Sequence, residues 1–327
     1  MKKLYIISCF LLTLFISNTL ISSSFAGKII ISNEGSDNIS IIDLDTYEII
    51  SNIESGKRPR DMKILKNKNQ LLVAASEDDI INIIDTNSYK IIGQIETGDD
   101  PEIFDISPDE KILVVSNEDD NEATVIDLSS GKIIRVVEEV GIEPEGVTFT
   151  PDGKLVYVTS EGTNTIIIID PYKGEIIDEI LVGNRPRRGA FVKNGSEYWV
   201  TNELGNSVSV IDTKTRTELK KIEFEIKGIR KTDITPVDFA VSHGQELAYI
   251  TLGRSKHVAV VDVDTHEIKD YILAGSRVWG AAITKDDKIL VVTNGNEDNI
   301  SIIDTRKNAA IKTIAVGRTP HTVRIIE

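Results

Sequence analysis

Residues 144–183 read PEGVTFTPDGKLVYVTSEGTNTIIIIDPYKGEIIDEILVG, and the same pattern recurs through most of the chain. The segment contains four short runs that are apolar or alternate between apolar and polar residues, at 145–150, 154–160, 165–170 and 175–182. The connections between these runs are rich in Pro, Gly, Asp and Asn, which are typical of tight turns. Short runs rich in Val, Ile and Tyr between such turns predict an antiparallel four-stranded meander.

The apolar run that ends in Asp recurs seven times. The repeated aspartates are Asp43, Asp85, Asp127, Asp170, Asp212, Asp262 and Asp304. They lie 42 or 43 residues apart, except for an interval of 50 residues between Asp212 and Asp262. Seven four-stranded units at this period match the blades of a β-propeller, for which about 40–45 residues are typical. A solenoid, the alternative, would need shorter repeats and end caps. Each repeated Asp is predicted to accept a backbone N–H two residues on and so fix a turn.

The strands at the two ends of the sequence predict how the ring closes. Three strands are predicted at 28–32, 39–43 and 48–53, before the first complete repeat. The last strand, 322–326, matches the first strand of a repeat. Pairing it with the other three completes one blade and removes the unpaired edges that an open array would expose. We therefore predict an all-β, seven-bladed β-propeller whose first blade is closed by the C-terminal strand.

Residues 1–26 are predicted to be a secretory signal peptide. Two lysines precede an uncharged apolar run, and Ala26 is the small residue that a signal peptidase accepts. An uncleaved anchor helix is the alternative. The predicted propeller then covers 27–327, as a monomer that is periplasmic or secreted. The single cysteine, Cys9, lies in the signal, so we expect no disulfide in the mature chain.

The chain is acidic, with 37 Lys and Arg residues against 52 Asp and Glu residues and a formal net charge of −15. Such a chain is repelled by the phosphates of nucleic acids and by anionic lipid surfaces. We therefore expect no nucleic acid partner and no membrane association once the signal is removed. Cationic or neutral ligands, or a protein with a basic patch, are favoured instead.

The repeats resemble the YVTN family of β-propeller repeats over the whole predicted mature chain. The family-like segments are YVTS at 157–160, WVTNE at 199–203 and VVTN at 291–294. The last three repeats are similar to β-propeller proteins associated with PQQ-dependent alcohol catabolism, through FEIKG at 224–228, DITPV at 233–237 and DYILAGSRVW at 270–279. This narrower resemblance implies a periplasmic, non-catalytic accessory factor that accompanies a quinoprotein dehydrogenase and a c-type cytochrome. It assigns no catalytic residues.

The inner strands of the predicted blades begin at seven positions that differ chemically from blade to blade. They are Arg60, Glu102, Glu145, Arg187, Val237, Trp279 and His321, flanked by Arg58, Arg185, Arg188, Arg277 and Arg318. Arg–Glu pairs around the channel mouth would orient a small carboxylate-bearing ligand, and the indole would add a stacking surface. An anionic cofactor such as PQQ suits this ring, and so does the face of a partner protein. Interblade ion pairs are the structural alternative.

A second set of residues recurs just after the second strand of the predicted blades. It comprises Glu34, Glu77, Glu118, Glu161 and Glu203, and the repeat is broken at Gly253 and Gly295. Because successive strands reverse direction, this acidic loop face is expected on the same side of the propeller as the ring. Solubility and turn formation are one explanation, a docking surface for a basic partner is another, and Ca²⁺ held by carboxylate oxygens is a third.

Two further questions stay open at the level of sequence. A lactonase or lyase that uses His321 with Glu102 or Glu145 as acid–base groups is the enzymatic alternative, although the four histidines are scattered over different repeats. The long interval places extra residues at 227–236, between an outer strand and the next inner strand. This insertion is either a lid or docking loop over the binding face or a tolerated surface insertion.

Overall fold

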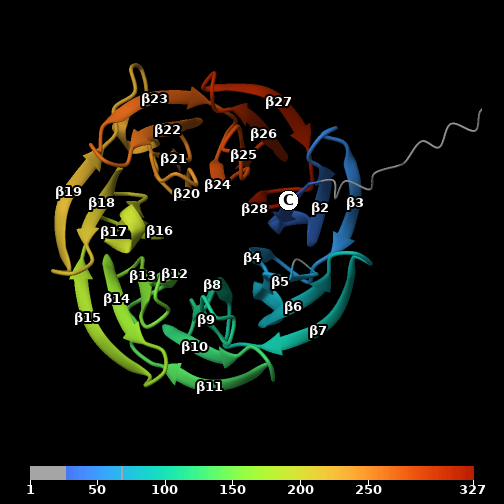
Figure 1. The fold of residues 1–327 in the computed structure, drawn as a ribbon, viewed down its shortest axis with the longest axis vertical. Helices are drawn as coiled ribbons and strands as arrows, with labels where there is room; N and C mark the ends of the chain where they lie inside the picture. Colours follow the sequence, from blue (N-terminus) through green and yellow to red (C-terminus); the bar gives the residue numbers. More distant parts are fainter. Residues whose placement is uncertain (1–26, 68) are drawn as a thin grey trace, which may run out of the picture.

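The computed structural model describes residues 27–67 and 69–327, and these form seven four-stranded antiparallel sheets around a central axis (Figure 1). The predicted signal peptide lies outside the described residues. Each sheet is one blade, and its innermost strand lies nearest the axis. The prediction of an all-β, seven-bladed propeller is confirmed.

The first four blades follow one another along the ring. Blade 1 contains β28 (Pro320–Ile326), β1 (Lys28–Asn33), β2 (Asn38–Asp43) and β3 (Ile49–Glu54). Blade 2 contains β4 (Pro59–Ile64), β5 (Gln70–Ala75), β6 (Ile80–Asp85) and β7 (Lys90–Glu96). Blade 3 contains β8 (Pro101–Ile106), β9 (Ile112–Asn117), β10 (Glu122–Asp127) and β11 (Lys132–Val137). Blade 4 contains β12 (Pro144–Phe149), β13 (Val156–Ser160), β14 (Thr165–Asp170) and β15 (Glu175–Leu181).

Three blades complete the ring. Blade 5 contains β16 (Pro186–Val192), β17 (Glu197–Asn202), β18 (Ser207–Asp212) and β19 (Thr217–Glu223). Blade 6 contains β20 (Phe239–Val241), β21 (Leu247–Thr251), β22 (His257–Asp262) and β23 (Ile268–Leu273). Blade 7 contains β24 (Val278–Ile283), β25 (Ile289–Asn294), β26 (Asn299–Asp304) and β27 (Ala309–Ala315). Short 3-10 turns lie at η1 (Glu34–Ser36), η2 (Ser76–Asp78), η3 (Lys193–Gly195) and η4 (Lys231–Asp233). Across 27–67 and 69–327, no helix has the length and apolar character needed to cross a membrane.

Strand β28 closes the ring as predicted. It pairs antiparallel with β1, so that Lys28 lies opposite Ile326 and Ile31 lies opposite Val323. Blade 1 is therefore built from both ends of the described chain (Figure 1). This pairing covers a strand edge that an open array would leave exposed.

The middle strands are mostly apolar because each blade packs between two neighbours. In β14, residues 165–169 are all buried, whereas the outermost strand β15 exposes most of its side chains. The apolar clusters lie between blades; one of them combines Ile29 and Ile31 of blade 1 with Val291 and Ile302 of blade 7. Burial of this kind contributes about 25 cal/mol per Å² of apolar surface. The unbroken apolar run of β14 thus follows from packing on both faces of the sheet.

The repeated Asp fixes the turn after the third strand, as predicted. Asp43 Oδ1 accepts the backbone N–H of Asp45 at 3.0 Å and that of Thr46 at 2.7 Å. Asp212 Oδ1 accepts the backbone N–H of Lys214 at 2.9 Å in the same way. The motif that reveals the repeat is therefore structural.

A hydroxyl group in the second strand of six blades ties each blade to the next. Each hydroxyl donates to the carbonyl oxygen of a residue in, or just before, the inner strand of the following blade. The pairs are Ser32 with Arg60, Ser116 with Glu145, Thr159 with Arg187, Thr201 with Val237, Thr251 with Trp279 and Thr293 with His321. The Thr of the YVTN-like segments thus holds neighbouring blades in register. In blade 2, Ala74 occupies this position.

Asp and Asn side chains in left-handed backbone positions fix the loops that lead into the inner strands. Their φ angles lie between 51° and 59°, and the residues are Asp37, Asp79, Asn121, Asn164 and Asp298. Asp and Asn tolerate this conformation better than most residues. Their side-chain oxygens accept the backbone N–H groups of Arg58, Asp100, Glu143, Arg185 and Thr319 in the next blade. Side chains from these loops are thereby held on one face of the ring.

The insertion at 227–236 connects β19 to β20 and packs against the ring. Ile234 is buried in the apolar cluster between blades 5 and 6, and Ile229 packs against the same cluster. Of residues 227–236, all of which the structure describes, Thr235 alone lines the central cavity discussed below. The insertion is therefore a packed connection, and it does not cover the cavity.

Candidate functional site

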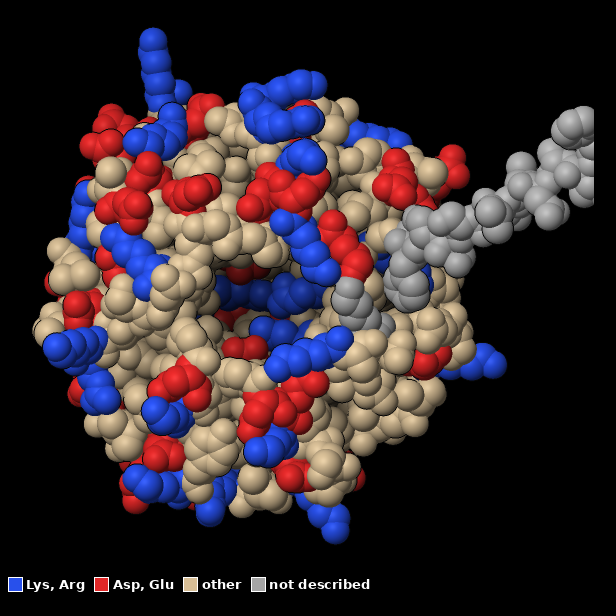
Figure 2. Space-filling model, viewed as in Figure 1, with Lys and Arg blue, Asp and Glu red and all other residues tan. Residues whose placement is uncertain are grey.

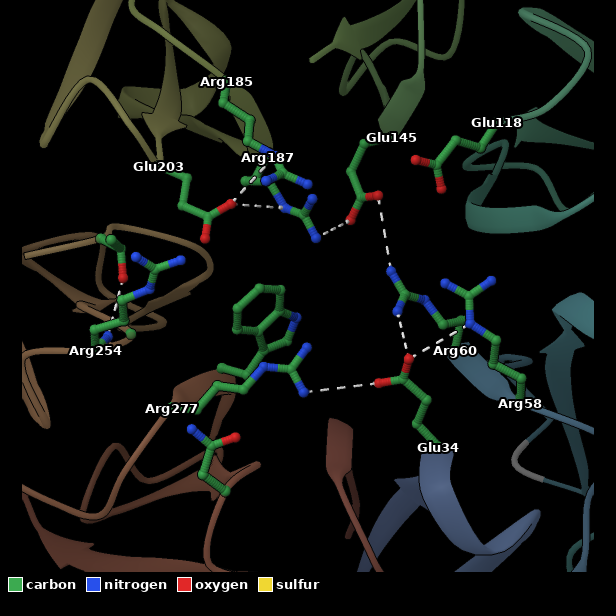
Figure 3. A pocket seen from close by; sticks show the side chains of 14 residues that line it. Glu34, Arg58, Arg60, Glu118, Glu145, Arg185, Arg187, Glu203, Arg254 and Arg277 are labelled. Carbon is green, nitrogen blue, oxygen red and sulfur yellow. Dashed lines mark hydrogen bonds and ion pairs between the residues drawn. The ribbon is translucent and has the colours of Figure 1, made fainter. Parts of the chain in front are cut away.

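A cavity of about 450 Å³ lies at the centre of the ring (Figure 3). Acidic and basic side chains are also visible within the hollow at the middle of the space-filling view (Figure 2). The cavity is lined by Glu34, Arg58, Arg60, Glu118, Glu145, Arg185, Arg187, Glu203, Thr235, Gly253, Arg254, Arg277, Trp279 and Asn296. Members of both predicted sets, the ring and the acidic loop face, thus meet in one cavity.

Six charged side chains alternate in sign around this cavity (Figure 3). In order they are Glu203, Arg187, Glu145, Arg60, Glu34 and Arg277. The successive nitrogen–oxygen distances are 3.9, 3.1, 3.9, 3.0 and 3.8 Å. The chain of contacts passes through five blades, so it links parts of the ring that are far apart in sequence. The predicted Arg–Glu pairing around the axis is present.

Further carboxylates pair with the buried arginines. Glu102 is fully buried, contacts Arg60 and lies 3.3 Å from Arg58. Glu161 contacts Arg187 in the same way. Arg60 and Arg187 are each 4 % exposed, so their guanidinium groups must be paired within the protein. Interblade ion pairs, the structural alternative for these positions, are therefore present.

Trp279 and His321 form a buried pair. The indole N–H of Trp279 donates to His321 Nε2 at 2.9 Å. Burial, together with the nearby arginines, holds the pKa of His321 well below its usual value, so the imidazole is neutral. Its Nε2 lone pair is already used by the indole, so His321 supports Trp279 and is not free to act as a base in the cavity.

The indole of Trp279 holds two guanidinium groups. Arg277 lies 4.3 Å and Arg187 lies 5.1 Å from the ring centroid, distances at which the cation is attracted to the ring. The residue is only 7 % exposed. Trp279 therefore positions the two arginines, and little of its ring is free to stack on a ligand. The sequence had suggested a stacking surface at this position.

Two arginines from blades 6 and 7 have little carboxylate contact. Among the described residues, Arg277 has one ion pair, at 3.8 Å to Glu34, and Arg254 has none. Burial and the neighbouring Arg60 and Arg187 lower the pKa of Arg277. An anion bound beside Arg277 would compensate this charge.

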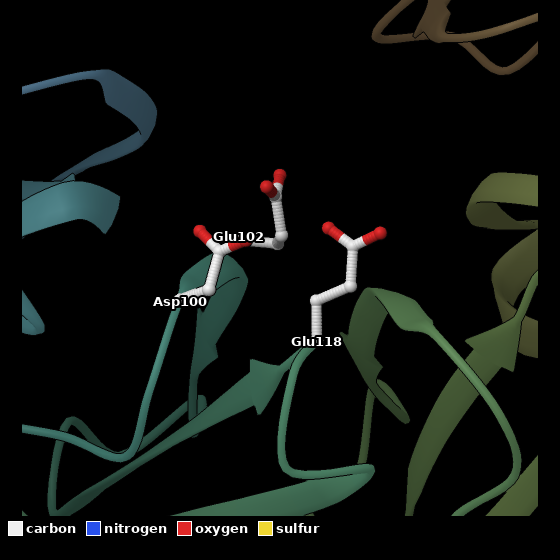
Figure 4. Close-up of side chains that lie close together, drawn as sticks. All are labelled: Asp100, Glu102 and Glu118. Atoms are coloured by element: carbon white, nitrogen blue, oxygen red, sulfur yellow. The ribbon is translucent and has the colours of Figure 1, made fainter.

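Three carboxyl groups of blade 3 gather on the other side of the cavity (Figure 4). Asp100, Glu102 and Glu118 each place an oxygen within 4.8 Å of the others. Burial, offset only in part by Arg60, and repulsion from Glu145 raise the pKa of Glu102 to about 8. Burial and repulsion also raise the pKa of Glu118. Burial and the crowding of carboxyl groups therefore favour the protonated form of Glu102.

This carboxyl cluster does not fit Ca²⁺. Arg58 lies 2.8 Å from Asp100, and Arg60 contacts Glu102, so guanidinium groups already pair with two of the three carboxyl groups. Ca²⁺ takes six to eight oxygen ligands, and Asp100 and Glu102 would have to give up their guanidinium partners to bind it.

The remaining predicted residues lie outside this cavity. Arg188 lines a separate cavity of about 240 Å³, where it lies 3.7 Å from Asp61 and 3.5 Å from Asp238. Arg187 lines the central cavity and Arg188 lines this second one, because successive side chains of a strand point to opposite faces. Glu77 is exposed and does not line the central cavity.

Arg254 and Asn296 line the cavity but were not predicted from the sequence. Each follows the glycine at which the glutamate repeat breaks, Gly253 in blade 6 and Gly295 in blade 7. The loss of the repeated glutamate could have pointed to these residues, because it marks the two blades whose loops place other side chains in the cavity.

The buried carboxyl of Glu102 predicts how stability changes with pH. Its folded pKa of about 8 exceeds the usual 4.5, so its contribution to stability is present at low pH and is lost as the pH rises through about 8. His321 has the opposite effect on stability. Because its folded pKa is lowered, its contribution to stability is lost as the pH falls. We expect the melting temperature of E102Q, relative to wild type, to rise between about pH 5 and about pH 9. Calorimetry with the exposed variant E77Q as control measures this, and a pH-independent difference would contradict it.

The comparisons with known proteins support the same architecture. A family model described as "YNCE-like beta-propeller" matches residues 67–282. The chain has no match among curated proteins. Among solved structures, it is similar to hydrazine synthase of Kuenenia stuttgartiensis, with 20 % identity and a TM-score of 0.76 over 85 % of this chain and 92 % of that chain.

Two further structures show the same fold at lower identity. The periplasmic gluconolactonase of Pseudomonas aeruginosa is 15 % identical, with a TM-score of 0.77 over 92 % of this chain and 99 % of that chain. The dihydro-heme d1 dehydrogenase NirN is 14 % identical, with a TM-score of 0.67 over 91 % of this chain and 74 % of that chain. At these identities the likeness shows the propeller fold alone, because propellers carry many unrelated activities.

Proposed function

The chain belongs to the YNCE-like β-propeller family. We propose that it is a non-catalytic binding protein whose central cavity takes a small ligand with a carboxylate group. Arg277 carries this proposal. Its guanidinium lines the cavity, and its single ion pair with the described residues, at 3.8 Å, is longer than a charge-assisted hydrogen bond. A ligand carboxylate would supply the missing bidentate partner.

The surroundings of Arg277 support a small-molecule site. Trp279 holds the guanidinium at 4.3 Å from its ring centroid, which fixes its position before a ligand arrives. Arg254 and Asn296 add hydrogen-bond donors to the same lining. The volume of about 450 Å³ is within the range of small-molecule pockets, about 300–1,000 Å³.

We also propose that this binding serves an accessory role in the periplasm, beside a quinoprotein dehydrogenase or a c-type cytochrome. The support is the resemblance of 224–237 and 270–279 to propellers associated with PQQ-dependent catabolism. PQQ carries carboxylates that Arg254 and Arg277 would hold, although Trp279 offers its planar ring little free surface. A tagged protein should therefore co-purify a dehydrogenase or cytochrome from periplasmic extract, and elution without either would contradict the accessory role.

Replacement of Arg277 by Gln is expected to lower the affinity for carboxylate ligands by about 10–100-fold. A hydrogen bond to a charged group contributes about 1.5–3 kcal/mol, and about 1.4 kcal/mol corresponds to a tenfold change. Calorimetric titration of wild type and R277Q with PQQ, gluconate and citrate measures the loss. R318Q is the matched control, because Arg318 is exposed and lies outside the cavity lining.

Two outcomes would count against this proposal. Equal affinities of wild type and R277Q for every carboxylate would remove Arg277 from the site. Hydrolysis of lactones by the purified protein, lost in E102Q, would contradict the non-catalytic assignment. That result would favour the lactonase-type alternative, with the protonated Glu102 as its acid.

A further inference from the structure

The charges that line the cavity are separated by blade. Blade 3 contributes the carboxyl group of Glu118 to the lining, with Asp100 and Glu102 beside it. Blades 6 and 7 contribute Arg254 and Arg277 and no acidic residue among those described. In a ring of seven, blade 3 lies across the axis from blades 6 and 7 (Figure 1). The cavity therefore has an acidic side and a basic side that face each other.

The acidic side has more carboxyl groups than cations to neutralise them. Arg58 and Arg60 are the cations that pair with Asp100 and Glu102, and both also contact Glu34. Glu118 forms no ion pair with any residue in 27–67 or 69–327. A cationic group of a ligand could therefore form an ion pair with Glu118 without displacing a cation of the protein.

The basic side is under-compensated in the complementary way. Arg277 is partly buried and has one long contact to Glu34, whereas Arg254 is exposed to solvent and has no ion pair within the described part of the chain. Asn296 completes this side of the lining with an amide. A carboxylate placed here can accept hydrogen bonds from both guanidinium groups.

Resting on the proposed function, we propose that the ligand is a zwitterion, with its carboxylate at Arg254 and Arg277 and a protonated amine at Glu118. A simple anion would compensate the basic side and leave the acidic side unchanged. A simple amine would do the reverse. A molecule that carries both charges satisfies the two sides at once, and its charges add little to the net charge of the cavity.

Three probes of equal length test this proposal: δ-aminovalerate, valerate and pentylamine. Calorimetric titration is expected to show that δ-aminovalerate binds at least about tenfold more tightly than either singly charged probe, since each added charge-assisted contact corresponds to about tenfold or more. E118Q should weaken δ-aminovalerate and pentylamine and leave valerate unchanged. R277Q should weaken δ-aminovalerate and valerate and leave pentylamine unchanged.

E77Q is the matched control for E118Q, because Glu77 occupies the same repeat position in blade 2 but is exposed outside the cavity. If valerate binds as tightly as δ-aminovalerate and E118Q changes neither, the zwitterion is overturned while anion binding at Arg277 stands. If R277Q leaves valerate binding unchanged, the proposed function itself fails. If none of the three probes binds, the zwitterion is overturned, and the carboxylate panel described above decides the proposed function separately.

Discussion

Removal of residues 320–327 is expected to abolish the folded monomer. The truncation takes away β28 and leaves one edge of β1 unpaired. It also removes Val323, which is fully buried, and the His321 ring that accepts the Trp279 N–H. Size-exclusion chromatography and thermal denaturation should show oligomers or aggregates that lack the wild-type unfolding transition.

Removal of Glu327 alone is the control for this truncation. Strand β28 ends at Ile326, so the control keeps every pairing with β1. We expect it to remain a monomer with a melting temperature close to that of the wild type. If the longer truncation behaves like the control, pairing of β1 with β28 is not required for the fold.

The second large effect is expected from Arg187→Met. Arg187 is 4 % exposed, contacts Glu161 and lies 3.1 Å from Glu145. Its removal takes the shared cation from two buried carboxylates, and breaking a buried pair in this way costs about 3–5 kcal/mol. Equilibrium unfolding in denaturant should show this loss of stability.

Arg185→Met is the matched control for Arg187→Met. Arg185 contacts the same carboxylate, Glu161, but its side chain is 42 % exposed. Solvent screening limits such a contact to about 1 kcal/mol or less. If both variants lose the same unfolding free energy, burial of Arg187 does not explain how much its ion pairs stabilise the protein.

The fold was predictable because its signals repeat. The Asp that ends the third strand recurs seven times, and each copy fixes a local turn, as Asp43 and Asp212 show. Closure was predictable for a related reason: the numbers of strands at the two ends of the sequence sum to one blade. These features depend on local chemistry and counting, and neither requires knowledge of distant contacts.

The site was predictable in part. Ring positions such as Arg60, Glu145 and Trp279 do line the cavity. However, Arg188 lines a different cavity, because successive side chains of a strand point to opposite faces. The raised pKa of Glu102 depends on burial by neighbouring blades, which a single sequence does not reveal.

Ala74 gives the ring one seam that differs from the others. It has no hydroxyl to donate to the carbonyl of Glu102, so blades 2 and 3 lack the hydroxyl-to-carbonyl hydrogen bond found at the other six seams, although Asp79 still accepts the backbone N–H of Asp100. Ion pairs join them instead, with Lys63 lying 3.0 Å from Asp105. Salt screens ion pairs, particularly exposed ones. Local opening of the ring in concentrated salt is therefore expected to begin at this seam, and it would admit water first to the acidic side of the cavity.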